Sequence, residues 1–361
     1  PCLNEAESIE FCLKKIKKIF DTSKFSFREV IVVDNGSTDE SIKIAKKYKA
    51  RIVFEKKKGY GNALKKGIQM SKGEFVCFAD ADDSYNFLEL KKFIDKAGKG
   101  YDLIQGCRFS KYGGKILPNA MPLTHQYFGN PFLSYLTKLF FKIKFNDVYC
   151  GFRMFKKKLY NRNFYFSNGM EFAVENLIKL SQESKNSIEI PITLHKDKRK
   201  KNISHLKTFS DGFKTLKFIL TCGSQFPIIF SVLVTFFLLI KKLFFIDEIS
   251  DFKDLMLLLF ILTQLIFFYL YSNLVSEYLG FKKGNFVNKV YNFINFNKAF
   301  IISLVIIFSF LTLLILYNFQ ILNFDNQLIN FIKFSLLFFV QIFVNILLVS
   351  VLEFFKYSKI S

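Results

Sequence analysis

The sequence contains no tryptophan, only three histidines and no pair of cysteines in a C-x-x-C arrangement. The six cysteines are dispersed, which indicates reduced side chains on a cytosolic face and excludes a disulfide framework and a zinc centre. The histidines have no metal-ligand spacing, and we assign no metal to His125, His195 or His205.

Acidic residues are also scarce, with 30 Asp and Glu against 52 Lys and Arg, for a formal net charge of +22. Such an excess suits two partners, nucleic acid or an anionic membrane surface. Zinc-finger spacing, an aromatic RNA-binding motif and a basic recognition helix are all absent from the sequence, so we predict no nucleic-acid partner. Basic residues stand beside the long apolar runs that begin near residue 223, and this combination is typical of proteins that contact anionic lipids.

The first 220 residues alternate between short apolar runs and segments of helical periodicity. The spacing of Asn4 and Glu7 is that of a capping box and predicts a helix over about 5–20. The other predicted segments are helices near 37–48, 59–70 and 87–97 and strands near 29–33, 51–54, 74–79 and 102–106. This order predicts an α/β domain with a mostly parallel sheet, in which Asp34, Gly59 and residues 80–84 share one crevice at the strand ends.

A short apolar run, Phe75–Ala79, ends abruptly in three carboxylates at Asp80, Asp82 and Asp83. Two carboxylates two residues apart can share a hard divalent cation that also holds phosphates, because Mg²⁺ takes few protein oxygens and completes its shell from substrate. An isolated D-x-D is more often a solvated acidic turn, so the surrounding motifs have to decide between these interpretations.

Four segments together resemble glycosyltransferase family 2: Pro1-x-x-Asn-Glu5, Val32-Val-Asp-Asn-Gly-Ser37, Gly59-Tyr-Gly61 and Ala79-Asp-Ala-Asp82. Later segments are similar to the dolichyl and polyprenyl-phosphate sugar transferases of that family: Gly106-Cys-Arg-Phe109, Gly129-Asn-Pro131, Asp147-Val-Tyr-Cys-Gly-Phe-Arg153, Gly169-Met-Glu-Phe172, Pro191-Ile-Thr193 and Ser204-His-Leu-Lys-Thr-Phe-Ser-Asp-Gly212. The resemblance covers residues 1 to about 220 in order and implies a nucleotide-binding GT-A fold.

The resemblance also implies site residues. A nucleotide-sugar donor would be bound by Pro1, Leu3, Glu5, Val32, Asp34, Gly59, Asp80, Ala81, Asp82 and Arg108. Mg²⁺ or Mn²⁺ would be held by Asp80 and Asp82, with Ser84 where many lipid-phosphate mannose transferases have a glutamine ligand. Asp82, Asp147 and Arg153 would be the catalytic residues.

The implied acceptor, a polyprenyl monophosphate, has a second pKa of about 6 and is already an anionic nucleophile at neutral pH, so it needs no strong general base. Its phosphate would be bound by Arg153, Arg199, Lys201 and Lys207, although an arginine alone is more often part of a surface ion pair. Glu171 and Glu175 either orient substrate or pair with nearby lysines.

Two further segments have two interpretations each. Residues 123–145 are apolar with scattered lysines and form either a core helix or a helix in the membrane interface. Residues 196–223 are rich in lysine and form a juxtamembrane anchor, a clamp for the acceptor phosphate, or both.

We therefore expect a GT-A domain over 1–195 whose first strand is truncated upstream of Pro1, a basic juxtamembrane segment over 196–223, and a membrane domain over 224–361. Four transmembrane helices are predicted at about 224–246, 255–275, 299–317 and 334–352, each near the ~20 residues that cross a bilayer. Counting cations by loop predicts a multi-pass protein with its catalytic domain on the cytoplasmic side, although Lys241, Lys242 and Lys253 count against it.

The predicted function is inverting, metal-dependent transfer of one hexose from a UDP-glucose or GDP-mannose type donor to undecaprenyl or dolichyl phosphate. Without tryptophan the chain cannot carry the Q-x-x-R-W signature of processive polysaccharide synthases, which favours transfer of a single sugar. Two alternatives are a transferase that acts on a lipid hydroxyl and a non-catalytic protein that scaffolds or translocates sugar-lipids. Oligomers are compatible with all three.

Overall fold

The computed structural model describes residues 1–22, 27–199, 208–223 and 296–318 and parts of 261–281 and 329–345. The chain divides into two compact units, Pro1–Ile219 and Leu220–Ser361. The first unit holds all of the predicted donor residues, and the two are described separately below.

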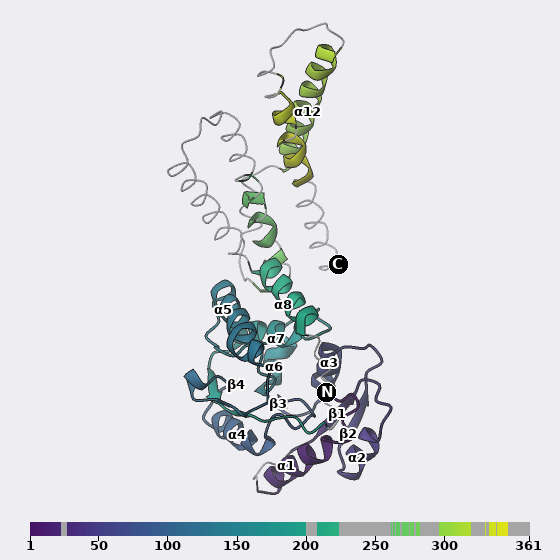
Figure 1. Ribbon diagram of the computed structural model, residues 1–361, viewed down its shortest axis with the longest axis vertical. Helices are drawn as coiled ribbons and strands as arrows, with labels where there is room; N and C mark the ends of the chain where they lie inside the picture. Colours follow the sequence, from purple (N-terminus) through teal and green to yellow (C-terminus); the bar gives the residue numbers. More distant parts are fainter. Residues whose placement is uncertain are drawn as a thin grey trace. The chain divides into compact units, whose positions relative to one another are not determined.

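The first unit alternates helices and strands along the chain (Figure 1). Its elements, with α8 running just past its end, are α1 (Ile9–Thr22), β1 (Ile31–Asp34), α2 (Ser41–Lys47), β2 (Arg51–Phe54), α3 (Tyr60–Met70), β3 (Phe75–Phe78), η1 (Phe87–Glu89), α4 (Leu90–Gly98), β4 (Leu103–Cys107), η2 (Ser110–Tyr112), β5 (Lys115–Ile116), η3 (His125–Gly129), α5 (Asn130–Phe141), β6 (Arg153–Lys156), α6 (Lys157–Asn161), α7 (Phe172–Glu183), β7 (Ser187–Pro191), β8 (Thr193–Leu194) and α8 (Thr208–Cys222). The predicted α/β alternation through β4 is confirmed.

The strands form three sheets, of which the four-stranded one is mixed, so the prediction of a mostly parallel sheet holds only in part. β1 and β2 pair in parallel, and so do β4 and β7, but β6 lies between β3 and β4 and runs antiparallel to both. The sequence pattern predicts no strand at 153–156, whereas Arg153 is the first residue of β6. Buried strands are recognised in a sequence as continuous apolar runs. The arginine at the start of this four-residue segment interrupts that pattern, so the strand is not evident from the sequence.

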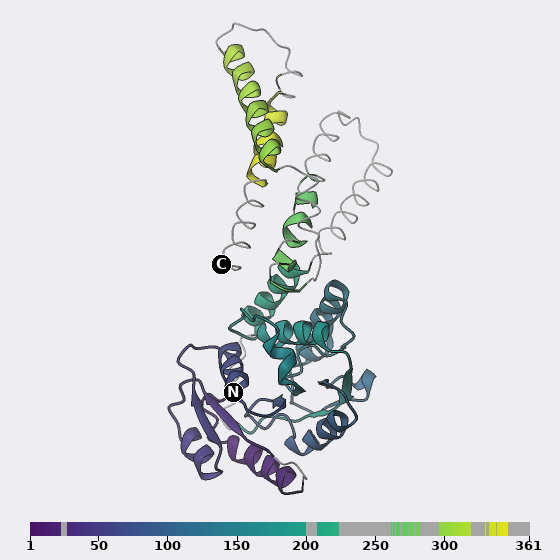
Figure 2. The ribbon, with the colours of Figure 1, turned by 180° about the vertical axis from the view of Figure 1, so that it is seen from behind.

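Helices cover both faces of the four-stranded sheet β3-β6-β4-β7 (Figures 1 and 2). Side chains alternate between the faces along a strand, and β6 shows the consequence. Met154 belongs to the apolar cluster that includes α1 and α4 residues, whereas the neighbouring Arg153 bonds to α7. The two faces therefore have different cores, one apolar and one with a buried polar network.

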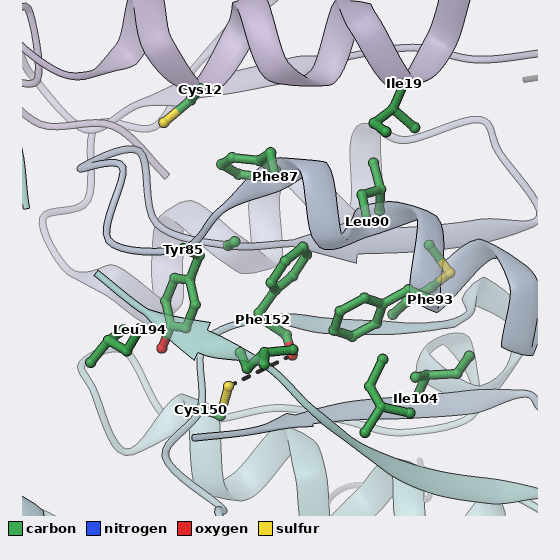
Figure 3. Packing of buried hydrophobic residues seen from close by; sticks show 14 residues of the cluster. Cys12, Ile19, Tyr85, Phe87, Leu90, Phe93, Ile104, Cys150, Phe152 and Leu194 are labelled. Carbon is green, nitrogen blue, oxygen red and sulfur yellow. Dashed lines mark hydrogen bonds between the residues drawn. The ribbon is translucent and has the colours of Figure 1, made fainter. Parts of the chain in front are cut away.

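Aromatic rings dominate the core on the α1 and α4 side (Figure 3). The ring of Phe152 lies 4.3 Å from that of Phe93, 5.6 Å from Phe87 and 5.8 Å from Tyr85, measured between centroids. Cys12 and Ile19 point from α1 toward this cluster. Because Tyr85 follows the acidic loop directly, packing of this core fixes the end of that loop.

A mostly apolar cavity of about 1050 Å³ is lined by residues of both β1 and β3, and Pro1 is at its wall. Asp80 and Asp82 do not line it.

Cys2 pairs in parallel with the end of β1, donating its N–H to the Val33 carbonyl at 2.8 Å and accepting from the Asn35 N–H at 3.0 Å. This isolated bridge ties the first residues of the sequence to the end of β1.

In the second unit, α12 (Phe296–Asn318) is the one described helix that is long and apolar enough to cross a membrane. Its apolar window, Ile301–Asn318, coincides with the predicted span at 299–317. A shorter apolar helix covers Ile332–Asn345. The predicted span at 224–246 lies outside the described residues, and those at 255–275 and 334–352 are described only in part, so a four-helix membrane domain stays a prediction.

Replacing Glu175 by alanine should destabilise the first unit strongly. Its buried carboxylate accepts from the Lys179 ammonium at 2.9 Å and from the N–H groups of Phe166 and Ser167, as in the lysine-pairing alternative. Removing it leaves a buried cation and the N–H groups of Phe166 and Ser167 without this partner, at a cost of about 3 kcal/mol or more. The thermal midpoint of the detergent-solubilised protein should fall by about 6–12 °C, measured by circular dichroism.

Glu40→Ala is the matched control, because Glu40 pairs with Lys43 on the surface, with both side chains mostly exposed. An exposed pair contributes little, so this variant should keep its midpoint within about 1 °C of the parent. Equal losses in the two variants would contradict the role given to Glu175.

Candidate functional site

The candidate site is formed where two loops are joined at the carboxyl end of β1. Asn4 accepts a hydrogen bond from the Thr38 N–H at 2.8 Å, and Ser41 accepts one from the Glu5 N–H at 2.8 Å. The Asn4 side chain is engaged by Thr38 and α1 begins at Ile9, so the predicted capping box at Asn4 is wrong. These long-range bonds hold Glu5 beside the loop that follows β1.

Asp34 and Asn35 organise that loop. Asp34 accepts from the N–H groups of Gly36 at 3.2 Å and Ser37 at 2.9 Å. Asn35 donates to the carbonyls of Glu55 and Lys57, and its side-chain oxygen accepts from the Gly59 N–H at 2.8 Å. Sequence reasoning missed Asn35, although its place between Asp34 and a glycine was a signal of a special turn.

Gly59 has a backbone requirement of its own. Its φ of 133° is unfavourable for any residue with a side chain, and a Cβ there would lie 2.3 Å from the Asn168 carbonyl oxygen. Asn62 donates its N–H to the same carbonyl at 3.3 Å. The predicted donor residue Gly59 therefore lets the start of α3 approach the loop before α7.

The three carboxylates after β3 have three different environments. Asp83 has a left-handed backbone, with a φ of 61°, and its carboxylate accepts from the Lys15 ammonium at 2.7 Å. Asp82 accepts from the Ser84 hydroxyl at 2.6 Å and from the Arg199 guanidinium at 2.6 Å. Asp80 lies near the Tyr60 side chain, while its Oδ1 is buried with no hydrogen-bond partner.

Burial makes two acids of this site unusually basic. It raises the pKa of Glu5 to about 7, with Arg199 acting in the opposite direction. Burial, followed by the negative charge of Asp82, raises the pKa of Asp80 to about 6. A cation placed among these carboxylates would favour their ionised forms, because an opposite charge within a few ångströms stabilises the charged state.

The residues fit a divalent cation that substrate helps to hold. In the part of the chain that the structure describes, no three His, Cys, Asp or Glu side chains converge as a complete metal site. Asp80, however, has an unbonded buried oxygen, and Asp82 already holds a positive charge, that of Arg199. Two carboxylates and open positions for phosphate oxygens suit Mg²⁺ or Mn²⁺.

Residues 194–199 run alongside the acidic loop. Leu194 pairs antiparallel with Tyr85, and the N–H groups of His195 and Lys198 donate to the carbonyls of Ser84 at 2.8 Å and Asp82 at 3.0 Å. This backbone pairing places Arg199 beside Asp82. The Nε atom of Arg199 also lies 3.8 Å from a carboxylate oxygen of Glu5. The structure thus brings Arg199 to the predicted metal ligands rather than to a separate phosphate site.

Arg108 and Asp147 form a buried two-point ion pair. Nε and Nη2 of Arg108 donate to the two carboxylate oxygens of Asp147 at 2.7 and 2.8 Å, and the Arg108 N–H adds a third bond. Gly151, farther along the same segment, donates its N–H to the Tyr85 hydroxyl, and a Cβ on Gly151 would lie 3.2 Å from an Asp80 oxygen. The pair therefore positions the segment that borders Asp80.

Arg153 is completely buried on the α7 side of the sheet. Its guanidinium donates to Gln105, to the Ala173 carbonyl and to Asn176, the last two at 2.9 and 2.7 Å. Contact between Arg153 and the acceptor phosphate stays a prediction that this geometry does not support.

The remaining predicted residues fall into three groups. Pro1 and Leu3 lie beside the site loops and are half-buried, whereas Val32 packs in a core cluster with Cys2, Ile9 and Leu13. The Ala81 carbonyl accepts from the Ser8 hydroxyl at 2.8 Å, and the Ser84 hydroxyl donates to the Asp82 carboxylate. Lys201 and Lys207 lie outside the described residues.

Residues 1–164 match the family described as Glycosyl transferase family 2. In Haloferax volcanii, the low-salt glycan biosynthesis hexosyltransferase Agl6 is 32% identical over 61% of this chain, which spans 52% of that relative. The dolichyl-phosphate hexose transferase of the same organism is 29% identical over 52% of this chain and 78% of its own length.

Among solved structures, the chain is similar to glucosyl-3-phosphoglycerate synthase from Mycobacterium tuberculosis in complex with Mn²⁺, UDP-glucose and phosphoglyceric acid. The likeness has a TM-score of 0.49 and 19% identity and covers 61% of this chain and 76% of that chain. The family match spans the loops that carry Glu5, Asp34, Gly59, Asp80 and Asp82. The chain therefore carries, in residues 1–164, a domain of glycosyltransferase family 2.

Proposed function

We propose that this protein transfers one hexose from a nucleotide sugar to a polyprenyl phosphate at a membrane surface. One observation carries the proposal: a family 2 domain gathers Asp80 and Asp82 at a strand end, one with an unbonded buried oxygen and the other already paired with a cation. Such a pair suits a metal-bound diphosphate better than it suits a solvated turn.

The proposed reaction is a single displacement. A phosphate oxygen of the acceptor forms the new bond to C1 of the sugar, and the bond from C1 to the nucleoside diphosphate breaks, with the electron pair leaving on the diphosphate. One displacement inverts the anomeric centre. Because the attacking oxygen is already ionised, positioning of the two substrates is the main task of the protein.

A divalent cation held by Asp80 and Asp82 would neutralise charge on the departing diphosphate. Ser84 holds Asp82 in place through its hydroxyl and its N–H. The joined loops at Asp34 and Asn35 would frame the nucleoside, as the resemblance of this loop implies.

Two observations support a lipid-linked acceptor. The relative named dolichyl-phosphate hexose transferase matches over most of its own length, and α12 is apolar enough to span a bilayer. We extend the proposal to a multi-pass protein with its catalytic unit on the cytoplasmic side, on the distribution of lysines between the apolar runs.

We further propose that Arg199 exchanges partners during the reaction. Its bond to Asp82 uses an oxygen that a divalent cation would also take, so the two cations compete. Its backbone neighbours stay paired with the acidic loop, and the side chain alone can swing away. The released guanidinium is then available to a phosphate oxygen, which it can contact through two donors.

Asp82→Asn should weaken Mn²⁺ binding by about tenfold or more, since even the loss of an indirect partner of a metal commonly costs that much. Asp83→Asn is the matched control from the same loop, because Asp83 faces Lys15 and Cys12. Titration of Mn²⁺ with UDP present, followed by electron paramagnetic resonance, measures both. Equal affinities for the two variants would remove Asp82 from the metal site.

Arg199→Gln should raise Mn²⁺ affinity about fivefold, as expected when a competing ion pair worth about 1 kcal/mol is lost. The same variant should raise the KM for polyprenyl phosphate. Arg162→Gln, which alters an exposed arginine near Glu183, should change neither quantity. An Arg199 variant with unchanged Mn²⁺ affinity would exclude the exchange.

The transferase itself is tested with membranes that contain the protein, undecaprenyl phosphate and labelled UDP-glucose or GDP-mannose. We expect a lipid-linked product that mild acid releases, formed only with Mg²⁺ or Mn²⁺ and lost in Asp82→Ala. An acid-stable and alkali-stable glycolipid would instead identify a lipid hydroxyl as the acceptor. Nucleotide binding without any product, across the common donors, would overturn the enzyme assignment.

A further inference from the structure

The helical segment formed by η3 and α5 is apolar on two faces, and only one of them is covered. The inner face packs into the first unit through five buried residues: Leu133, Ser134, Thr137, Phe140 and Phe141. A helix of a globular domain ordinarily presents polar side chains on the opposite face. This helix does not.

The outward face consists of large apolar and aromatic side chains, which we name the aromatic face: Leu123, Tyr127, Phe128, Phe132, Tyr135 and Leu139. Phe128 is 76% exposed, Tyr135 62% and Phe132 54%. Positions 128, 132, 135 and 139 follow helical spacing, so their side chains lie along one stripe. Contiguous exposed apolar surface of this kind marks a place where something else binds.

The charge beside the aromatic face has one sign. No acidic residue occurs between Asp102 and Asp147, a stretch that contains the whole segment. Lys142 and Lys144 follow the helix directly, and both are exposed. A partner of this surface should therefore be apolar with anionic groups at its boundary.

The neighbouring helix α8 immediately precedes the long apolar runs in the sequence. The Phe141 ring stacks on Phe218 of α8 at 6.4 Å between centroids. α8 ends at Cys222, where the long apolar runs of the sequence begin. Tyrosine and lysine beside apolar residues are the composition of membrane boundary layers.

We propose that the aromatic face inserts into the boundary layer of a membrane that contains anionic lipids. The aromatic rings enter the region between head groups and acyl chains, about 5–10 Å deep, and Lys142 and Lys144 contact the head groups. A lipid surface is favoured over a protein partner because the patch combines a full apolar stripe with uncompensated lysines in a chain that also carries α12. This contact does not depend on the transferase activity.

The absence of tryptophan from the sequence makes the test direct, since one introduced tryptophan is then the only one among these 361 residues. Phe128→Trp and Phe132→Trp are each reconstituted as the full chain into vesicles of phosphatidylcholine and phosphatidylglycerol, with or without bromine on the acyl chains. We expect brominated lipid to reduce the emission of each at least twofold, with a blue-shifted maximum. Both positions are exposed, so the larger ring meets little hindrance.

Phe54→Trp is the matched control, because Phe54 is a phenylalanine in β2 that is 61% exposed and lies outside the aromatic face. Its emission should be unaffected by bromine. Adding Lys142→Glu and Lys144→Glu to Phe128→Trp should weaken quenching in anionic vesicles more than in pure phosphatidylcholine. Quenching of Phe128→Trp no greater than that of Phe54→Trp would overturn the proposal, as would a blue shift without quenching, which would indicate a protein partner.

Discussion

Several carboxylates are confined together in a poorly hydrated space, and the rest of the site depends on how their charge is balanced. Glu5 comes from the N-terminal loop and Asp80 and Asp82 from the loop after β3, and the Ser8 hydroxyl joins the two segments by donating to the Ala81 carbonyl at 2.8 Å. Burial favours protonation, which is why the pKa of Glu5 rises to about 7 and that of Asp80 to about 6. Such an arrangement is stable with a cation nearby and strained without one. Arg199 supplies that cation here, through its ion pairs with Asp82 and Glu5.

A second buried polar network holds the frame on which the acidic loop rests. Gln105 donates to the carbonyls of Asp147 and Cys150, both at 3.0 Å, and accepts from Arg153. Glu189 accepts from the N–H groups of Asn146 and Asp147 at 2.8 and 2.9 Å. Satisfied networks of this kind rigidify the segments that they join. Residues 147–153 are thereby fixed, and with them Gly151, the neighbour of Asp80.

The strands and loops that carry Asp34, Gly59 and Asp80 were predictable because local apolar periodicity and turn residues mark them. The strand that begins at Arg153 was not predicted, since the partners that compensate a cation in a strand, Gln105 and Asn176, lie far away in sequence. The pairing of Arg199 with Asp82 spans 117 residues, and no local rule predicts it. For residues 123–145 the sequence could not decide between core and interface, because both faces of the helix are apolar and only packing reveals which one is covered.

The same geometry bears on the choice of acceptor. Transfer to a lipid hydroxyl needs a general base with a carboxylate oxygen available to take the proton. Asp147 is unsuited, because both of its oxygens bind Arg108 and its side chain is fully buried. Glu171 is also poorly suited to act as the general base, because one of its carboxylate oxygens accepts from the Gly169 N–H and the other is buried. An acceptor that arrives already ionised needs neither residue as a base, which agrees with the proposed phosphate acceptor, for which positioning is the main requirement.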